Sequence, residues 1–123
     1  MSPKKMARSV AGARIAFGIG FLAMPGLTGR VWIGPDADRP AVRLLTQAIG
    51  ARDLAMGLGA VIAMSRDAPA RGWFEAISLT DALDFACALA AGHRIAPLAR
   101  ANVLVLAGGS ALQAAYAASG VDD

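Results

Sequence analysis

The sequence predicts an all-α fold, a bundle of four transmembrane helices that forms one integral membrane domain over residues 1–123. Three observations lead to this fold class. Hydrophobic residues make up 56% of the chain and charged residues only 17%, whereas soluble domains carry roughly 25% charged residues. The apolar residues gather in four stretches that are bounded by charges, proline or glycine. The alternation with a period of two residues that indicates half-buried strands is absent, and alanine and leucine dominate.

The four apolar stretches are the predicted transmembrane spans. A helix needs about 20 residues, within a range of about 17–25, to cross roughly 30 Å of hydrocarbon. The first stretch follows a basic leader with Lys4, Lys5 and Arg8, and the second is the longest. All four are long enough to cross, and they cover residues 9–27, 41–64, 72–91 and 99–119.

The segment from residue 25 to residue 40 is the one long connection, and we expect a loop there. It places Val31-Trp32-Ile33 between two prolines. Tryptophan is favoured in the lipid headgroup region, so the segment is suited to lie at the membrane surface. Packing of Trp32 on the bundle is an equally good interpretation.

The basic leader resembles a secretory signal, but Arg14 interrupts its apolar stretch and no cleavage site of the Ala-x-Ala type follows. We therefore expect the first helix to be retained, in a multi-pass protein of the plasma (inner) membrane. The positive-inside rule favours cytoplasmic termini. It sets five basic residues at one end against four at the other: Lys4, Lys5, Arg8, Arg66 and Arg71 against Arg30, Arg39, Arg94 and Arg100. A soluble helical bundle remains as a further alternative.

Five ionisable residues fall near the middle of the predicted spans: Arg14, Arg52, Asp53, Asp81 and Asp84. A lone charge at the bilayer centre costs about 2.5–3.5 kcal/mol, so we expect these residues to pair inside the bundle. We predict that Arg52 meets the face shared by Asp81 and Asp84, and that Asp53 meets Arg14. Fully ionised, the five side chains sum to minus one, which favours protonation of one carboxyl group. The expected hydrogen-bonding partners are Gln47, Thr80 and Gln113.

Small residues lie on the same helix faces as these charges. Gly50 and Gly57 flank Asp53 in one span, and Gly18 follows Arg14 in another. Small residues let membrane helices approach closely, which supplies packing where lipid removes the hydrophobic drive. In the last span we expect one inward side to be marked by Gly109, Gln113 and Tyr116.

Two interpretations of the charged network follow. Intramembrane ionisable residues often form a proton or ion relay or a substrate site. The alternative is structural, in which the pairs fix helix register and neighbour choice. We favour the structural interpretation because opposite charges at a shared depth satisfy each other without a ligand.

The sequence contains no motif that identifies a reaction, and it predicts no enzyme, no cofactor, no metal site and no nucleic-acid partner. Cys87 and His93 are the single cysteine and histidine, and Ser110 lacks the context of a nucleophile elbow. The basic residues form no stripe. The pair Asp81-Ala-Leu-Asp84 resembles the paired aspartates of CDP-alcohol phosphotransferases, but the further Gly, Ala-Arg and second aspartate pair of that family are missing.

The motif Gly-x-Arg-Asp-x-x-x-Gly, here Gly50 to Gly57, together with Arg14 and the segment from Trp73 to Asp84, resembles a family of uncharacterised proteins. These are small four-helix integral membrane proteins of actinobacteria. The resemblance implies an accessory subunit that packs on a larger membrane complex, such as the permease of a mycobacterial lipid importer of the mammalian-cell-entry (Mce) type, in contact with membrane lipid. As an alternative, the chain resembles the DoxX-like four-helix proteins. That resemblance implies a small transporter or a membrane oxidoreductase subunit whose buried charges would bind a proton or a small ligand.

Overall fold

The computed structural model describes residues 1–123 and contains five α-helices, two 3-10 turns and no strand. The predicted all-α class is therefore confirmed. The order of the elements is α1 (Pro3–Ala23), α2 (Pro25–Trp32), η1 (Pro35–Asp38), α3 (Pro40–Ser65), α4 (Arg71–Ala91), η2 (Gly92–Arg94) and α5 (Pro97–Ala118).

Helix α1 begins well before residue 9, where the sequence predicts its start. The Ser2 hydroxyl accepts a hydrogen bond of 3.3 Å from the Lys5 amide, and Pro3 stands at the first helical position. A serine cap satisfies an amide that the helix leaves free, and proline lacks the amide that would otherwise be orphaned there. The basic leader is therefore the first turn of the helix.

The prediction of a loop over residues 25–40 is wrong for most of that segment, which folds into α2 and η1. Pro25 and Pro35 each begin one of these elements, as the fixed φ of proline favours. Gly34, with a φ of 94°, separates them, and this left-handed region favours glycine. The Trp32 ring lies 6.1 Å from the Phe21 ring between centroids, so the end of α2 packs on α1.

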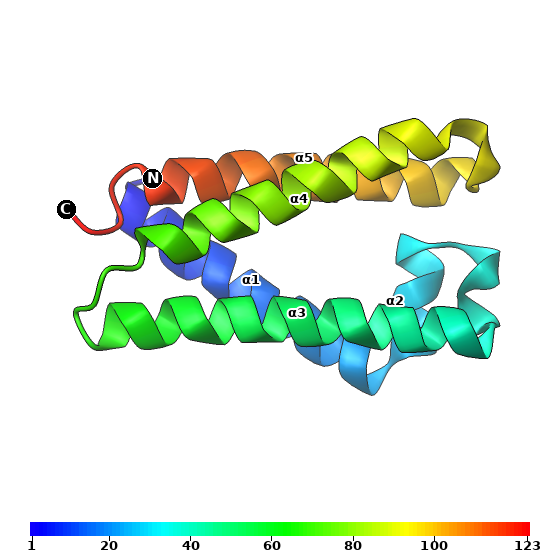
Figure 1. The fold of residues 1–123 in the computed structure, drawn as a ribbon, viewed down its shortest axis with the longest axis horizontal. Coiled ribbons are helices and arrows are strands. Elements are labelled where there is room, and N and C mark those ends of the chain that lie inside the picture. Colours follow the sequence, from blue (N-terminus) through cyan, green and yellow to red (C-terminus); the bar gives the residue numbers. More distant parts are fainter.

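The four long helices form two pairs, α1 with α3 and α4 with α5 (Figure 1). Helix α1 also packs on α5, whereas α3 and α4 touch along only a short length. Both termini lie at the end of the bundle where α3 turns into α4, and α2 and the turn from α4 to α5 lie at the other end. The two pairs are closest at the end with the termini and diverge toward α2.

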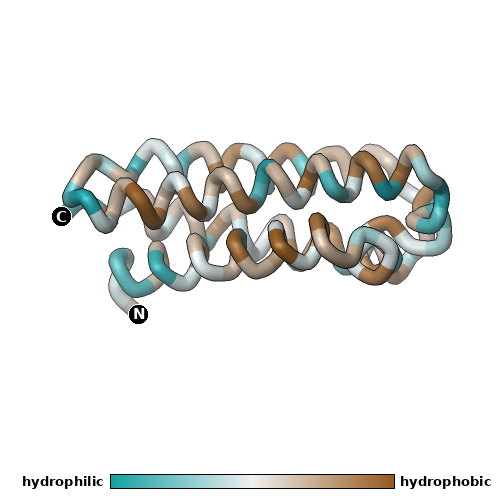
Figure 2. The backbone as a smooth tube through the Cα atoms, turned by 90° about the horizontal axis from the view of Figure 1, so that it is seen from below, coloured by the Kyte–Doolittle hydropathy of each residue, from teal (hydrophilic) through white to brown (hydrophobic).

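The hydrophobic core lies at the end with the termini. Phe74 and Ile77 are its largest fully buried side chains, and most other members are alanines. Large hydrophobic residues are also exposed along the length of the helices. Hydrophilic residues lie at the two ends and at several positions along the helices (Figure 2). The core cluster consists of Ala7, Val10, Ala11, Ala60, Ala63, Ala70, Phe74, Ile77, Ala114, Ala117, Ala118 and Val121.

The closest helix contact joins α1 and α3 through two glycines. A Cβ atom added to Gly18 would lie 2.6 Å from the Leu54 amide nitrogen, and one added to Gly50 would lie 2.9 Å from the Gly18 carbonyl oxygen. Both distances are too short for real side chains. The predicted small-residue face therefore brings two backbones together. Gly109 makes no such contact, since no atom of another helix lies within 4 Å of its Cβ position, and it lines a cavity between the helices instead.

Three helices, α1, α3 and α5, are long and apolar enough to cross a membrane. Helix α4 carries more charge than these three helices. Every 18-residue stretch of α4 contains Glu75, Asp81 and Asp84, whereas each of the other helices has a stretch with at most two charged residues. Its 21 residues would nevertheless extend about 30 Å at about 1.5 Å per residue. Composition alone therefore supports three crossings.

The C-terminal tail caps the start of α4. The two Asp122 carboxylate oxygens accept hydrogen bonds from the amides of Ala70, at 2.8 Å, and Arg71, at 3.1 Å. These amides lie at the start of α4, one on the N-cap residue and one on the first helical residue, where the helix dipole favours an anion. The hydrogen bond from Ala70 is the largest cause that lowers the pKa of Asp122 below its ordinary value. A distant carboxylate thus replaces the local cap that α4 lacks.

We expect Asp122→Ala to lower the thermal stability of the purified protein at neutral pH. Because the pKa of Asp122 is lower in the folded state, its stabilisation is present above the ordinary value of 3.8 and disappears as the pH falls through the folded value. Melting curves of both proteins should therefore converge below about pH 4. The matched control is Asp123→Ala, which removes a carboxylate that makes no hydrogen bond to α4. Equal losses in the two variants at neutral pH would contradict the capping role.

Candidate functional site: an ion-pair network and a cavity

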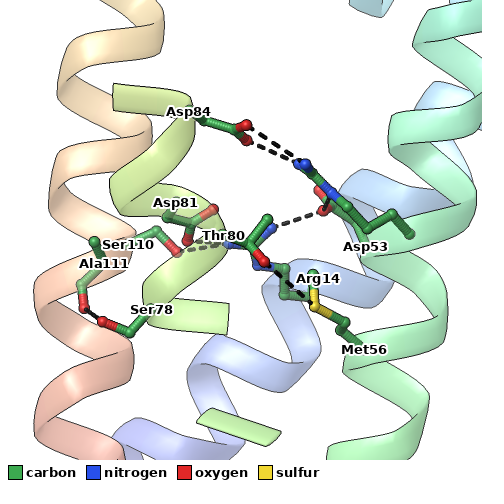
Figure 3. A network of polar contacts seen from close by, with 10 residues as sticks. Arg14, Asp53, Met56, Ser78, Thr80, Asp81, Asp84, Ser110 and Ala111 are labelled. Atoms are coloured by element: carbon green, nitrogen blue, oxygen red, sulfur yellow. Dashed lines mark hydrogen bonds and ion pairs between the residues drawn. The ribbon is translucent and has the colours of Figure 1, made fainter. Parts of the chain in front are cut away.

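Arg14 joins all four long helices from the middle of α1. Its Nη1 donates to Asp53 Oδ1 of α3 at 2.7 Å, and its Nη2 donates to Asp81 Oδ2 of α4 and, at 3.3 Å, to the Ser110 hydroxyl of α5 (Figure 3). Only 8% of the Arg14 side chain is exposed. A guanidinium presents several donors in a fixed fork, which suits it to hold partners on three helices at once. Arg14 is therefore the hub of the network.

A second ion pair connects α3 and α4, which otherwise touch along only a short length. Arg52 Nη2 donates to Asp84 Oδ2 at 2.8 Å, and Arg52 Nη1 donates more weakly to Asp84 Oδ1 at 3.4 Å. These side chains are 34% and 27% exposed, respectively. The Arg52 Nε atom lies 3.5 Å from Asp53 Oδ1 but makes no hydrogen bond there, and it is the buried side-chain polar atom left without a partner.

The structure brings the five predicted residues together as a network, with one change of partner. Arg14 contacts Asp53 and Arg52 contacts Asp84, as the sequence predicts, but Asp81 pairs with Arg14 instead of with Arg52. Asp81 and Asp84 share a helix face, yet they are separated by about 4.5 Å along the axis at about 1.5 Å per residue. Asp81 is therefore level with Arg14, while Asp84 is level with Arg52.

The expected neutral partners do not contact these charges. Gln47 donates to the Leu22 carbonyl at 3.4 Å, and the Thr80 hydroxyl lies 4.0 Å from the Met56 sulfur. Ser110 takes the place that we expected for them. The sequence contains a signal for the contact between Ser110 and Arg14. Ser110 lies one turn before Gln113 and next to the small residue Gly109, near the middle of α5.

A cavity of about 210 Å³ opens between the two helix pairs beside the network. All five charged residues line it, together with Ser110 and Gln113. Its remaining walls are apolar and come mainly from α1, α2, α3 and α5. They include the aromatic side chains of Phe17, Phe21 and Trp32 and the aliphatic side chains of Val10, Ile49, Val105 and Leu106. Polar and apolar chemistry thus meet in one chamber at mid-height of the bundle.

Two buried carboxylates keep one oxygen each for this cavity. Asp53 and Asp81 use Oδ1 and Oδ2, respectively, for Arg14, and their other oxygens accept no hydrogen bond. These oxygens are not among the fully buried unpaired atoms, so they face accessible space. Their side chains are otherwise only 8% and 4% exposed. The arrangement therefore offers two acceptors to a small group inside the cavity.

The geometry contains no group of three or more histidine, cysteine or acidic side chains that could hold a metal ion. Cys87 is exposed on α4, and His93 lies in η2 at the end of the bundle. Ser110 donates no proton to a base and instead accepts from Arg14. The chemistry that the site presents is ion pairing and hydrogen bonding.

Comparison with known proteins provides no relative for this chain, since no family model, no curated protein and no solved structure matches it.

Proposed function

We propose that the chain is an integral membrane protein that crosses the bilayer four times, through α1, α3, α4 and α5. The carrying observation is the internal pairing of the charges that distinguish α4: Asp81 and Asp84 are bound by arginines of α1 and α3. Pairing removes most of the cost of placing these carboxylates in hydrocarbon. Glu75, the remaining acid of α4, lies near the helix start, where it can reach the interface.

Reporter fusions at the two termini distinguish four crossings from three. Both termini lie at the same end of the bundle (Figure 1), so four crossings put both reporters on one side of the membrane. If α4 did not cross, the remaining three crossings would separate them. Reporters on opposite sides would contradict the proposal, and extraction of the protein by alkaline carbonate would contradict any membrane role.

We also propose that the termini face the cytoplasm of the inner membrane. Arg43 lies at the start of α3 near Asp38, 3.5 Å away, and must be counted with that end. Each end then carries five basic residues, so the bias expected from the sequence disappears. The basis of the proposal is the leader with Lys4, Lys5 and Arg8, because the charges flanking the first helix usually dominate orientation. The same reporters test it.

The function that we propose is that of a non-enzymatic subunit, which packs laterally on a larger membrane complex and stabilises or regulates it. Two features of the fold support this proposal. Short connections leave little of the chain outside the helices, and large hydrophobic side chains are exposed on the outer surface of the bundle. The resemblance of Gly50 to Gly57 to the actinobacterial family extends the proposal to a lipid transporter, with the permease of an Mce-type importer as the partner and membrane lipid around it.

Purification of the endogenous protein in mild detergent tests the subunit role. We expect larger membrane chains to co-migrate with it and to be lost as the detergent becomes harsher. The variant Asp81→Asn tests whether the network is purely structural. If it is, we expect the yield of folded protein and the formation of the complex to fall together. A solitary protein at every detergent strength would contradict the subunit role.

The cavity favours a second candidate function, a small DoxX-like transporter or membrane oxidoreductase subunit that uses the charges for a proton or a small ligand. A structural network alone does not require a chamber beside it. Proton flux into liposomes that contain the purified protein, measured with an internal pH dye, tests this candidate. We expect flux that Arg52→Met abolishes, and equal flux in empty liposomes would contradict it.

A further inference from the structure

The charges that line the cavity do not cancel. Two arginines and three aspartates face it, and the cavity has no other ionisable lining residue. Fully ionised, they leave one negative charge in a chamber surrounded by apolar helix. An uncompensated charge in such surroundings is costly, and the cost is removed either by a proton on one carboxyl group or by an occupant with one positive charge.

The position of the spare charge is defined by the contacts. Arg52 engages both oxygens of Asp84, and Arg14 engages one oxygen each of Asp53 and Asp81. The excess negative charge therefore falls on the two free oxygens of Asp53 and Asp81, which face accessible space. Two carboxylates that share a single guanidinium leave these oxygens as a negatively charged site that attracts a cation.

The rest of the lining suits an organic cation better than a bare ion. Phe17, Phe21 and Trp32 line the same cavity, and their rings pack in series, with centroids 6.2 Å and 6.1 Å apart. Aromatic faces attract ammonium groups, and tryptophan does so most strongly. An apolar cavity of about 150 Å³ holds one benzene molecule, so about 210 Å³ admits a small ammonium compound.

We propose that this cavity binds a small monovalent organic cation whose ammonium group, primary or substituted, sits against the free oxygens of Asp53 and Asp81 while its apolar part lies on Phe17, Phe21 and Trp32. The proposal deepens the second candidate function by naming its ligand class, and it rests on that use of the cavity. It is independent of whether the chain docks on a larger complex.

The test measures binding of choline to the purified protein in detergent by tryptophan fluorescence. Trp32 lines the cavity, whereas Trp73 packs over Gly59 outside it. In a Trp73→Phe protein, we expect choline to change the fluorescence of Trp32 until the site is saturated. In a Trp32→Phe protein, we expect choline to leave the fluorescence of Trp73 unchanged. The uncharged analogue 3,3-dimethyl-1-butanol, which has the same shape, should bind at least tenfold more weakly. Equal responses to the two compounds, or none to choline, would overturn the proposal.

Substitutions that preserve shape locate the charge. We expect Asp53→Asn and Asp81→Asn to weaken choline binding at least tenfold, and Glu75→Gln to leave it unchanged, since Glu75 is an acid of α4 outside this cavity. Gel filtration and circular dichroism establish that each variant is folded. Calorimetric titration of the unsubstituted protein gives a second measurement should a variant fail to fold. Undiminished binding in folded Asp81→Asn would place the cation elsewhere.

The ammonium group can come from a free amine or from a lipid headgroup, and bilayer composition separates these sources. Choline titrations are repeated in nanodiscs of phosphatidylglycerol alone and in nanodiscs that also contain phosphatidylethanolamine. A weaker choline response in the second set indicates that the lipid headgroup competes for the site, and an equal response indicates a free amine. Proton flux that persists without choline binding would remove the cation site and leave the transporter candidate standing.

Discussion

Replacing Arg14 with methionine is expected to lower the free energy of unfolding in detergent by about 3–5 kcal/mol, the range for breaking a buried ion pair by removing one partner. Methionine keeps the length and flexibility of the side chain but removes the donors to Asp53, Asp81 and Ser110. Asp81 then remains buried without a counter-charge, and Asp53 keeps only Arg52, whose Nε atom lies 3.5 Å from its Oδ1. Unfolding titrated with sodium dodecyl sulfate and followed by tryptophan fluorescence measures the loss.

Two comparisons separate lost charge pairing from lost packing. The triple variant Arg14→Met, Asp53→Leu, Asp81→Leu should recover most of the stability, because a buried ion network replaced by apolar side chains is often neutral. Arg52→Met should cost less, because it removes the partner of one carboxylate, Asp84, whereas Arg14→Met removes the main partner of two. A loss from Arg52→Met as large as the loss from Arg14→Met would contradict the role of Arg14 as the hub.

The sequence predicts the parts of the fold that depend on local composition. Helix α3 lies close to the predicted residues 41–64, because Pro40 can open a helix and the polar segment after Ser65 ends it. Helix α2 escaped prediction because its proline and glycine content indicates a turn, although Pro25 also suits a first helical turn. Local rules therefore define the long helices and miss a short one between prolines.

The candidate site was predictable to the extent that depth along the helices decides it. Arg14 and Asp53 were expected to pair on this basis, and they do. The choice of Asp81 between Arg14 and Arg52 depends on how α1 is rotated against α4, which no local pattern contains. The cavity depends on how the two helix pairs are placed relative to each other, and they are joined by contacts far from it, such as those of Phe74 and Ile77 in the core. Tertiary packing therefore supplies what the sequence pattern leaves open.

A methyl group added to α1 should lower stability at Gly18 and raise it at Gly12. We expect Gly18→Ala to lower the free energy of unfolding by about 1–3 kcal/mol, the usual cost of overpacking a close contact. The new Cβ would meet the Leu54 amide nitrogen at 2.6 Å, and backbone atoms have little freedom to move away. The helices must separate, which also strains the hydrogen bond from Arg14 to Asp53 one turn away.

Gly12→Ala is the matched control, because no atom of another element lies within 4 Å of that Cβ position. We expect it to stabilise the protein by about 0.5–1 kcal/mol, since alanine loses less backbone freedom than glycine when a helix forms. Both substitutions add the same atom to the same helix, so the gain in helix propensity is the same in both. The difference between their free energies of unfolding therefore reports the contacts of the new Cβ atom. Losses of equal size at both positions would show that α1 and α3 do not meet at Gly18, and the alignment that places Arg14 against Asp53 would then fail with it.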